Sequence, residues 1–207
     1  QQIRDLTEKF DGNRELVALE IGKIVAAETY LYGVAEKCIA CDGKGFIPKG
    51  EWKTEDCFVC NMKGRIYKYK TMPHYEETLK KFDKLESFRN KNQIADAIYH
   101  GVCAGLAVLT EGILVAPLEG VVSARLLKNN DGSECVAVSF AGPIRSAGGT
   151  GQALSVLIAD ILRRMFKISA PIMTSEEVER YKEEVGVYAR GLQYRPSNPQ
   201  LETIARK

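Results

Sequence analysis

Four of the six cysteines in this 207-residue chain form two C-x-x-C pairs, and no other feature limits the fold as strongly. The pairs are Cys38 with Cys41 and Cys57 with Cys60, separated by 15 residues. Two thiolates two residues apart fit on one tight turn, and two such turns complete the tetrahedron that zinc prefers. We therefore predict a structural Zn²⁺ site with these four cysteines as its ligands.

A redox-active dithiol or two disulfides would also explain the cysteine pairs. The first residues do not resemble a secretory signal, however, and cysteine pairs in a protein that is not exported more often bind metal. A four-cysteine site has no open coordination position, so we expect the metal to replace a core that residues 38–70 are too short to build. Cys103 and Cys135 lie in apolar surroundings and are predicted to be small buried side chains.

Positive charge is concentrated around these cysteines. Residues 37–91 carry 13 basic and 8 acidic side chains, whereas the whole chain has a net charge of only +2. The segment is the best candidate for a surface that faces a polyanion, although a solubilising lysine-rich surface explains it equally well. Lys63, Arg65 and Lys68 alternate with aromatic residues, which suits phosphate contact with base stacking. The alternative is that the aromatic side chains form a small core for the metal module.

Hydrophobic patterning predicts an α+β fold, with mixed helices packed on a small antiparallel sheet and the four-cysteine zinc module inserted between helices. Helical periodicity runs over residues 14–34 and 94–109, and β-branched segments on both sides of a turn at 129–132 predict a hairpin. Three domains are expected: an N-terminal helical segment at 1–37, a zinc-binding insert at 38–71, and an α+β domain at 72–207 with helices at 72–110, a hairpin at 113–140 and helices at 150–207.

The C-terminal part is predicted to be helical. Thr174 or Ser175 is expected to cap a helix that Gly186 interrupts, and Ser197 is expected to start the last one. No apolar run reaches the roughly 18 residues that a membrane span requires, so we expect no membrane contact and a cytoplasmic location. The chain begins without methionine and stops inside a helical pattern, so we expect it to be a piece of a longer protein.

A glycine-rich stretch at 140–151 lies between a predicted strand and a predicted helix. Glycines at such a junction permit close backbone approach, and helix N-terminal amides attract anions. The candidate anion-binding or nucleic-acid-binding residues here are Arg145, Ser146, Gly148, Gly149 and Thr150. The stretch matches neither a P-loop nor G-x-G-x-x-G, so a tight strand-to-helix turn is the favoured alternative.

Several strings over residues 94–204 carry a family resemblance. They are APLEG at 116–120, FAGPIRSAGGT at 140–150, EEVERY at 176–181 and LQYRPS at 192–197. In order and spacing they are similar to the N-terminal region of the large subunit of archaeal D-family DNA polymerase. We do not match the zinc insert at 38–70 to the usual pattern of that family.

This resemblance implies a replicative DNA-directed DNA polymerase, a nucleotidyltransferase that works with a smaller 3′–5′ exonuclease subunit and uses Mg²⁺ in the parent enzyme. The implied partners are the remainder of the large subunit, the small exonuclease subunit and DNA, and a homo-oligomer is a further expectation. In the family, the catalytic aspartates belong to a later part of the large subunit. No matching motif occurs here, so no catalytic residue is carried over.

Three functions are therefore weighed for this chain. The favoured one is a non-catalytic scaffold and assembly segment of a polymerase large subunit, which could also assist DNA binding. The second is a stand-alone zinc ribbon that binds nucleic acid. The third is a chaperone-like zinc module, because the sequence from Cys38 to Gly45 is similar to the C-x-x-C-x-G-x-G repeat of J-protein chaperones.

Overall fold

The computed structural model describes residues 2–49, 53–57, 64–69, 74–88, 90–109, 120–142, 149–188 and 196–206. Within these ranges the chain forms seven helices and three two-stranded antiparallel sheets, so the predicted α+β class is confirmed. The elements are α1 (Gln2–Lys9), α2 (Arg14–Tyr32), β1 (Gly33–Lys37), β2 (Phe46–Pro48), β3 (Thr54–Asp56), β4 (Arg65–Tyr69), α3 (Tyr75–Asp83), α4 (Lys91–Leu109), β5 (Val121–Lys128), β6 (Glu134–Phe140), α7 (Gly149–Met165), α8 (Ser175–Tyr188) and α9 (Asn198–Arg206).

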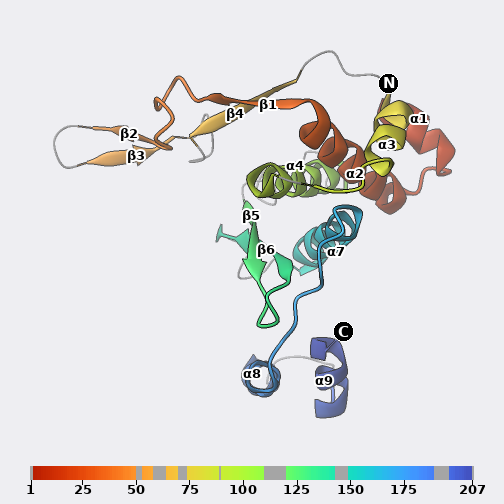
Figure 1. Cartoon of the computed structure of the whole chain (residues 1–207). Coiled ribbons are helices and arrows are strands. Elements are labelled where there is room, and N and C mark those ends of the chain that lie inside the picture. The colour runs from red at the N-terminus through yellow and green to blue at the C-terminus, as the bar shows by residue number, and fades with distance from the viewer. Residues whose placement is uncertain are drawn as a thin grey trace.

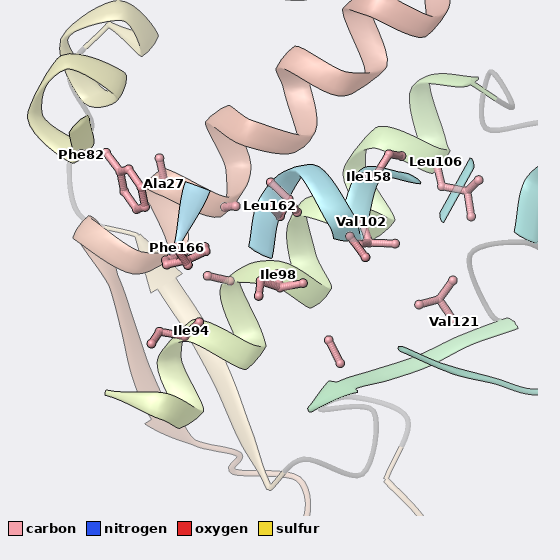
Figure 2. Packing of buried hydrophobic residues seen from close by; sticks show 14 residues of the cluster. Ala27, Phe82, Ile94, Ile98, Val102, Leu106, Val121, Ile158, Leu162 and Phe166 are labelled. Atoms are coloured by element: carbon pink, nitrogen blue, oxygen red, sulfur yellow. The ribbon is translucent and has the colours of Figure 1, made fainter. Parts of the chain in front are cut away.

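The main core lies between the helices α2, α4 and α7 and the sheet β5–β6. Both α2 and α4 start at an asparagine whose side-chain oxygen accepts a backbone N–H of the first turn, from Leu16 and Gln93 respectively. Figure 2 shows side chains from these elements converging on one apolar cluster. Its members include Ala27, Ile94, Ile98, Val102, Leu106, Val121, Ile158, Leu162 and Phe166.

The two longest helices, α2 and α4, touch backbone to backbone at glycines. A Cβ atom on Gly101 would lie 2.6 Å from the carbonyl oxygen of Gly22, and one on Gly105 would lie 2.9 Å from that of Ala18. Larger residues would push the helices apart. Glycine at this crossing therefore sets how closely the two helices pack.

Four aromatic rings close one end of this core. Tyr30, Phe82, Phe88 and Phe166 have ring centroids 5.1–6.1 Å apart, mostly edge to face. Phe82 comes from α3, which ends at Asp83. The cluster attaches α3 and the segment after it to the ends of α2 and α7.

The strands β5 and β6 form the predicted hairpin, with Val121 opposite Phe140 and Lys128 opposite Glu134. Gly132 occupies the turn with φ +83°. Asn129 fixes the turn to the chain after α7, because its side chain donates to the carbonyl of Ala170 and accepts the N–H of Ile172. The earlier part of the predicted hairpin, at 113–119, lies outside the described residues.

The last two helices lie apart from the core, as Figure 1 shows, and α8 packs mainly on α9. Thr174 and Glu177 form a capping box: the Thr174 hydroxyl accepts the N–H of Glu177, and the Glu177 carboxylate accepts the N–H of Thr174. The predicted cap is confirmed. The predicted break at Gly186 is wrong, because α8 continues to Tyr188; an interior glycine costs a helix only about 1 kcal/mol.

The end of α2 in the structure also differs from the helix end that the hydrophobic periodicity predicted. The helix ends at Tyr32, and β1 begins at the next residue, within a region that the pattern assigned to helix. In the described part of the chain, none of the helices has the length and apolar character to cross a membrane.

Candidate metal centre

A long arm carries the cysteines. Its stalk is the antiparallel pair β1–β4, which runs from Gly33 opposite Tyr69 to Lys37 opposite Arg65. The shorter pair β2–β3 forms a second hairpin. Figure 1 shows the arm leaving the end of α2 and reaching away from the helices, with β2–β3 at its far end.

Three thiols meet between these two strand pairs. The Sγ atoms of Cys38, Cys41 and Cys57 all lie within 4.8 Å of one another, and the three residues are at most 4% exposed. The Sγ atoms of Cys38 and Cys57 are 3.8 Å apart, far beyond the roughly 2.05 Å of a disulfide. A tetrahedron with metal–sulfur bonds of about 2.3 Å has an edge of about 3.8 Å. The three free thiols could therefore hold a metal ion.

Backbone hydrogen bonds hold the cysteines in these positions. The N–H of Cys38 donates to the Gly64 carbonyl at 2.9 Å, and the N–H of Cys57 donates to the Gly45 carbonyl at 3.0 Å. The N–H of Gly45 in turn donates to Cys41 Sγ at 3.2 Å. This bond fixes the position of the Cys41 sulfur relative to the following turn.

The two turns that carry the cysteine pairs approach each other through glycines. Gly43 and Gly64 have φ values of +78° and +70°, and a Cβ on Gly64 would lie only 2.1 Å from the Gly43 carbonyl oxygen. No other residue fits at position 64. The sequence indicated that glycines follow each pair, but their mutual contact required the structure.

The described interior of the arm is almost entirely sulfur. Only two isoleucines, Ile47 and Ile66, pack on the three cysteines there, and both are partly exposed. Phe46 is 42% exposed, so this aromatic does not build the small core that one alternative required. Trp52 and Phe58 lie outside the described residues. A segment with so little apolar burial needs another source of stability.

Charged side chains cover the outside of the arm. Lys37 pairs with Asp42 at 2.6 Å, and Lys49 pairs with Glu55 at 2.5 Å. The hydrogen bond from Lys37, together with its positive charge, holds the pKa of Asp42 below its usual range. All four groups are exposed, so these ion pairs add little stability and leave the lysines able to change partners.

The other predicted site residues are placed as follows. Gly149 and Thr150 are exposed in the first turn of α7, and Arg65 and Lys68 belong to β4, with side chains outside the described part. The remaining predicted residues, Cys60, Lys63, Arg145, Ser146 and Gly148, lie outside the described residues. The fourth thiol ligand and the anion site therefore stay predictions.

One buried polar residue was not anticipated from the sequence. Glu28, on α2, is buried, and its Oε1 accepts no hydrogen bond in the part of the chain that the structure describes. Burial raises the pKa of this carboxyl. Its position three residues from Val25 and Leu31, as the only charged residue of α2 after Lys23, was the only signal in the sequence.

Comparison with known proteins identifies the class to which the helical part belongs. The family model described as DNA polymerase II large subunit DP2, N-terminal, matches residues 68–207. The matched part of the chain is therefore a segment of a DNA polymerase subunit. More specifically, the chain belongs to the family of N-terminal regions of the archaeal DNA polymerase II large subunit, which confirms the resemblance to D-family polymerases.

Curated relatives agree with this assignment. The DNA polymerase II large subunit of Picrophilus torridus is 48% identical over 137 residues, covering 65% of this chain and 13% of the relative. That of Thermoplasma acidophilum is 51% identical over 118 residues, covering 56% and 11%. That of Haloquadratum walsbyi is 34% identical over 200 residues, covering 86% and 8%. The chain thus spans about a tenth of the length of these relatives. The four cysteines of the two C-x-x-C pairs precede the segment that the family model matches.

Proposed function

We propose that this chain is a non-catalytic scaffold and assembly segment of a replicative DNA-directed DNA polymerase large subunit. The observation that carries the proposal is the apolar surface of its C-terminal half. Among the described residues, half of the exposed large apolar side chains lie between positions 156 and 204: Val156, Leu157, Ile172, Val187 and Ile204.

Exposed apolar side chains on α8 and α9, beside an apolar groove, suit contact with another protein surface. Val187, on α8, is 71% exposed, and Ile204, on α9, lines a groove of about 400 Å³ with Pro196 and Pro199. These two helices lie apart from the main core and pack chiefly on each other. The partners that suit this surface are the remainder of the large subunit, the small exonuclease subunit or a second copy of the chain.

Nucleotidyl transfer is assigned to another part of the parent enzyme. Magnesium in polymerases is held by carboxylate oxygens, whereas the candidate metal group in the described part of this chain consists of thiols, which suit zinc. In a primer-extension assay with Mg²⁺, we expect the 207-residue chain alone to add no nucleotides. Robust magnesium-dependent synthesis by the chain would overturn the non-catalytic assignment.

The assembly role is tested by mixing the chain with the remainder of the large subunit, with and without the small exonuclease subunit, and measuring association by light scattering. We expect the double variant Val187→Asp with Ile204→Asp to weaken association at least tenfold, because two charges would be desolvated at the contact. Ile3→Asp, on the exposed face of α1, is the matched control. Association of the double variant as tight as wild type would contradict the proposal.

For the arm, we propose a structural zinc ion held by Cys38, Cys41, Cys57 and Cys60. The buried thiols, the 3.8 Å sulfur separation and the N–H bond to Cys41 Sγ support this assignment. When bound, the ion supplies a closed tetrahedral crosslink between the two cysteine turns. Elemental analysis of purified protein is expected to give one zinc per chain, and Cys60→Ser is expected to reduce that value sharply. Protein free of transition metal would overturn the assignment.

A further inference from the structure

The hairpin β5–β6 is a narrow sheet packed against two helices. Among the described residues, β5 and β6 pair only with each other, so this sheet has two strands. The helix α4 packs on β5, and α7 packs on β6 and on α4. Two helices side by side are about 20 Å wide, whereas two strands are about 10 Å wide. The helical layer can therefore cover more strands than the described part of the chain supplies.

The edge of β6 that faces away from β5 carries backbone groups suited to a further strand. The Asn129 N–H donates to the Ser133 carbonyl at 2.8 Å, and from there hydrogen-bonded and non-hydrogen-bonded pairs alternate along the hairpin. The backbone of Ala137 therefore bonds to β5, whereas the N–H and C=O groups of Val136 and Val138 point away from it. In the described part of the chain, these outward groups make no backbone hydrogen bond to another element.

The sequence of β6 does not protect this edge against strand addition. Sheet edges are normally blocked by charged side chains, proline or a bulge. Residues 135–140 read CVAVSF, which is the longest uncharged run in any of the described strands. The neighbouring strand β5 contains Arg125 and Lys128 and has a register irregularity between Val121 and Ser123. Strand addition is therefore favoured at β6 over β5.

We infer that an extended segment from the remainder of the polymerase large subunit adds to this edge of β6 and makes a three-stranded sheet. The inference deepens the proposed assembly role and rests on it. Added strands are held by main-chain hydrogen bonds, and their alternate side chains give specificity. Val136, Val138 and Phe140 pack on the main core, whereas Ala137 and Ser139 lie on the opposite face of the strand. The matching segment is therefore apolar on its core side and small or polar on the other.

A covalently linked segment suits this edge better than a separate chain. The seven residues of β6 give an edge about 23 Å long, and a contact of that length buries far less than the roughly 1,200 Å² that stable interfaces between separate chains need. A segment of the same polypeptide needs no such area, because its effective concentration is high. The chain spans only 8–13% of the length of its relatives, so a parent subunit has ample sequence to supply the strand.

Amide hydrogen exchange, measured in the 207-residue chain and in the whole large subunit, tests the inference. The amides of Val136 and Val138 are expected to exchange about tenfold more slowly in the whole subunit, because the added strand supplies them with acceptors. The amide of Ala137, which bonds to β5, is the internal control and is expected to be protected in both proteins. This comparison uses wild-type protein, so it does not depend on whether a variant folds.

A matched pair of variants tests whether main-chain hydrogen bonds cause the protection. In the whole subunit, Val136→Pro removes an outward donor and is expected to return the Val138 amide to its exchange rate in the 207-residue chain, because proline blocks pairing at an edge. Val136→Ala removes the same apolar side chain but keeps the N–H, so it is expected to retain the protection. Equal loss of protection in the two variants would overturn the inference.

Three further outcomes would overturn the inference. They are equal exchange of the Val136 and Val138 amides in the two wild-type proteins, protection in the shorter chain that rises with its concentration and so indicates a second copy, and protection that requires the small exonuclease subunit. The proposed function is tested separately by Val187→Asp with Ile204→Asp, on α8 and α9. Fast exchange at β6 together with weakened association of that double variant would overturn the added strand and leave the proposed function standing.

Discussion

The arm and the helical body are stabilised by different kinds of interaction. The body buries a cluster of 14 residues from α2, α3, α4, β5, α7 and the residue after α7, and two of them, Phe82 and Phe166, also pack with the rings of Tyr30 and Phe88. The described interior of the arm contains three cysteines with two partly buried isoleucines. The body therefore depends on apolar burial spread over many side chains, whereas the arm depends on a few atoms at one point.

This difference predicts that the stability of the two regions responds differently to substitutions. A distributed core loses stability in increments, because each truncated side chain removes only its own contacts and leaves a cavity. A module built around a metal gains most of its folding free energy from metal binding, about 10–16 kcal/mol for structural zinc. Loss of the metal therefore removes nearly all of this stabilisation at once. Substitutions in the two regions should therefore differ in size and in what else they disturb.

The largest expected effect is Cys57→Ser. Removing one thiolate from the sulfur cluster should abolish zinc retention and unfold the arm, while the helical circular dichroism persists because the body has its own core. Zinc analysis and proteolysis of the arm measure the outcome. Cys103→Ser, in the body, is the control and should retain zinc. Collapse of the helical signal in Cys57→Ser would show that the two regions are not independent.

Next in size is Leu162→Ala. Leu162 is fully buried where α7 meets α4, so its truncation should cost about 2–5 kcal/mol in the free energy of unfolding of the body. Urea denaturation followed by helical circular dichroism provides the measurement. Leu157→Ala, at a half-exposed position of the same helix, should change stability by only about 0.5 kcal/mol. Loss of zinc from folded Leu162→Ala would contradict the separation of the two regions.

A smaller effect is expected for Gly101→Ala. The added methyl group would lie 2.6 Å from the Gly22 carbonyl oxygen and 2.7 Å from Leu162, which should cost about 1–3 kcal/mol despite the higher helix propensity of alanine. Gly151→Ala, on α7, meets nothing within 4 Å and should leave stability unchanged or slightly raised. Thermal unfolding of both variants distinguishes a steric effect from a propensity effect. Equal shifts in melting temperature would exclude the close helix crossing.

The smallest expected effect is on the pH dependence of stability, which should have opposite directions in the body and in the arm. Burial raises the pKa of Glu28 above its ordinary value of 4.5, so its contribution to stability is fully present below that value and is lost as pH rises through the folded-state pKa. Glu28→Gln should remove this loss and raise the urea midpoint at neutral pH. Acid has the opposite effect on the arm, because protonated thiols release zinc. A Glu28→Gln variant with the pH profile of wild type would exclude this role for the carboxyl.

Much of the fold followed from local signals in the sequence. The hairpin turn depends on a glycine with positive φ at position 132. The cap at Thr174 and the start of α9 at Ser197 depend on side chains that bond to nearby backbone. The cysteine spacing predicted a site of four thiols, and three of them meet among the described residues. Each signal acts within a few residues or through one strong geometric requirement.

Features that depend on distant partners could not be predicted in this way. The pairing of β1 with β4 joins segments about 30 residues apart, and the periodicity of α2 gave no sign that a strand would begin at Gly33. Gly22 and Gly101 are in contact between two helices. Considered one at a time in the sequence, each glycine only lowers the helix propensity of its segment. Gly186 was misjudged for the same reason, since an interior glycine interrupts a helix only when other interactions fail to compensate for it.

The passage from α2 into β1 has a mechanical consequence. The N–H of Gly33 still bonds to the Thr29 carbonyl of the helix, and this same glycine is the first residue of the stalk, so no slack linker separates them. A force applied at the far end of the stalk would therefore act as a torque on α2, whose other contacts include the glycine crossing with α4. Movement of the arm would therefore be transmitted to the glycine crossing of α2 with α4.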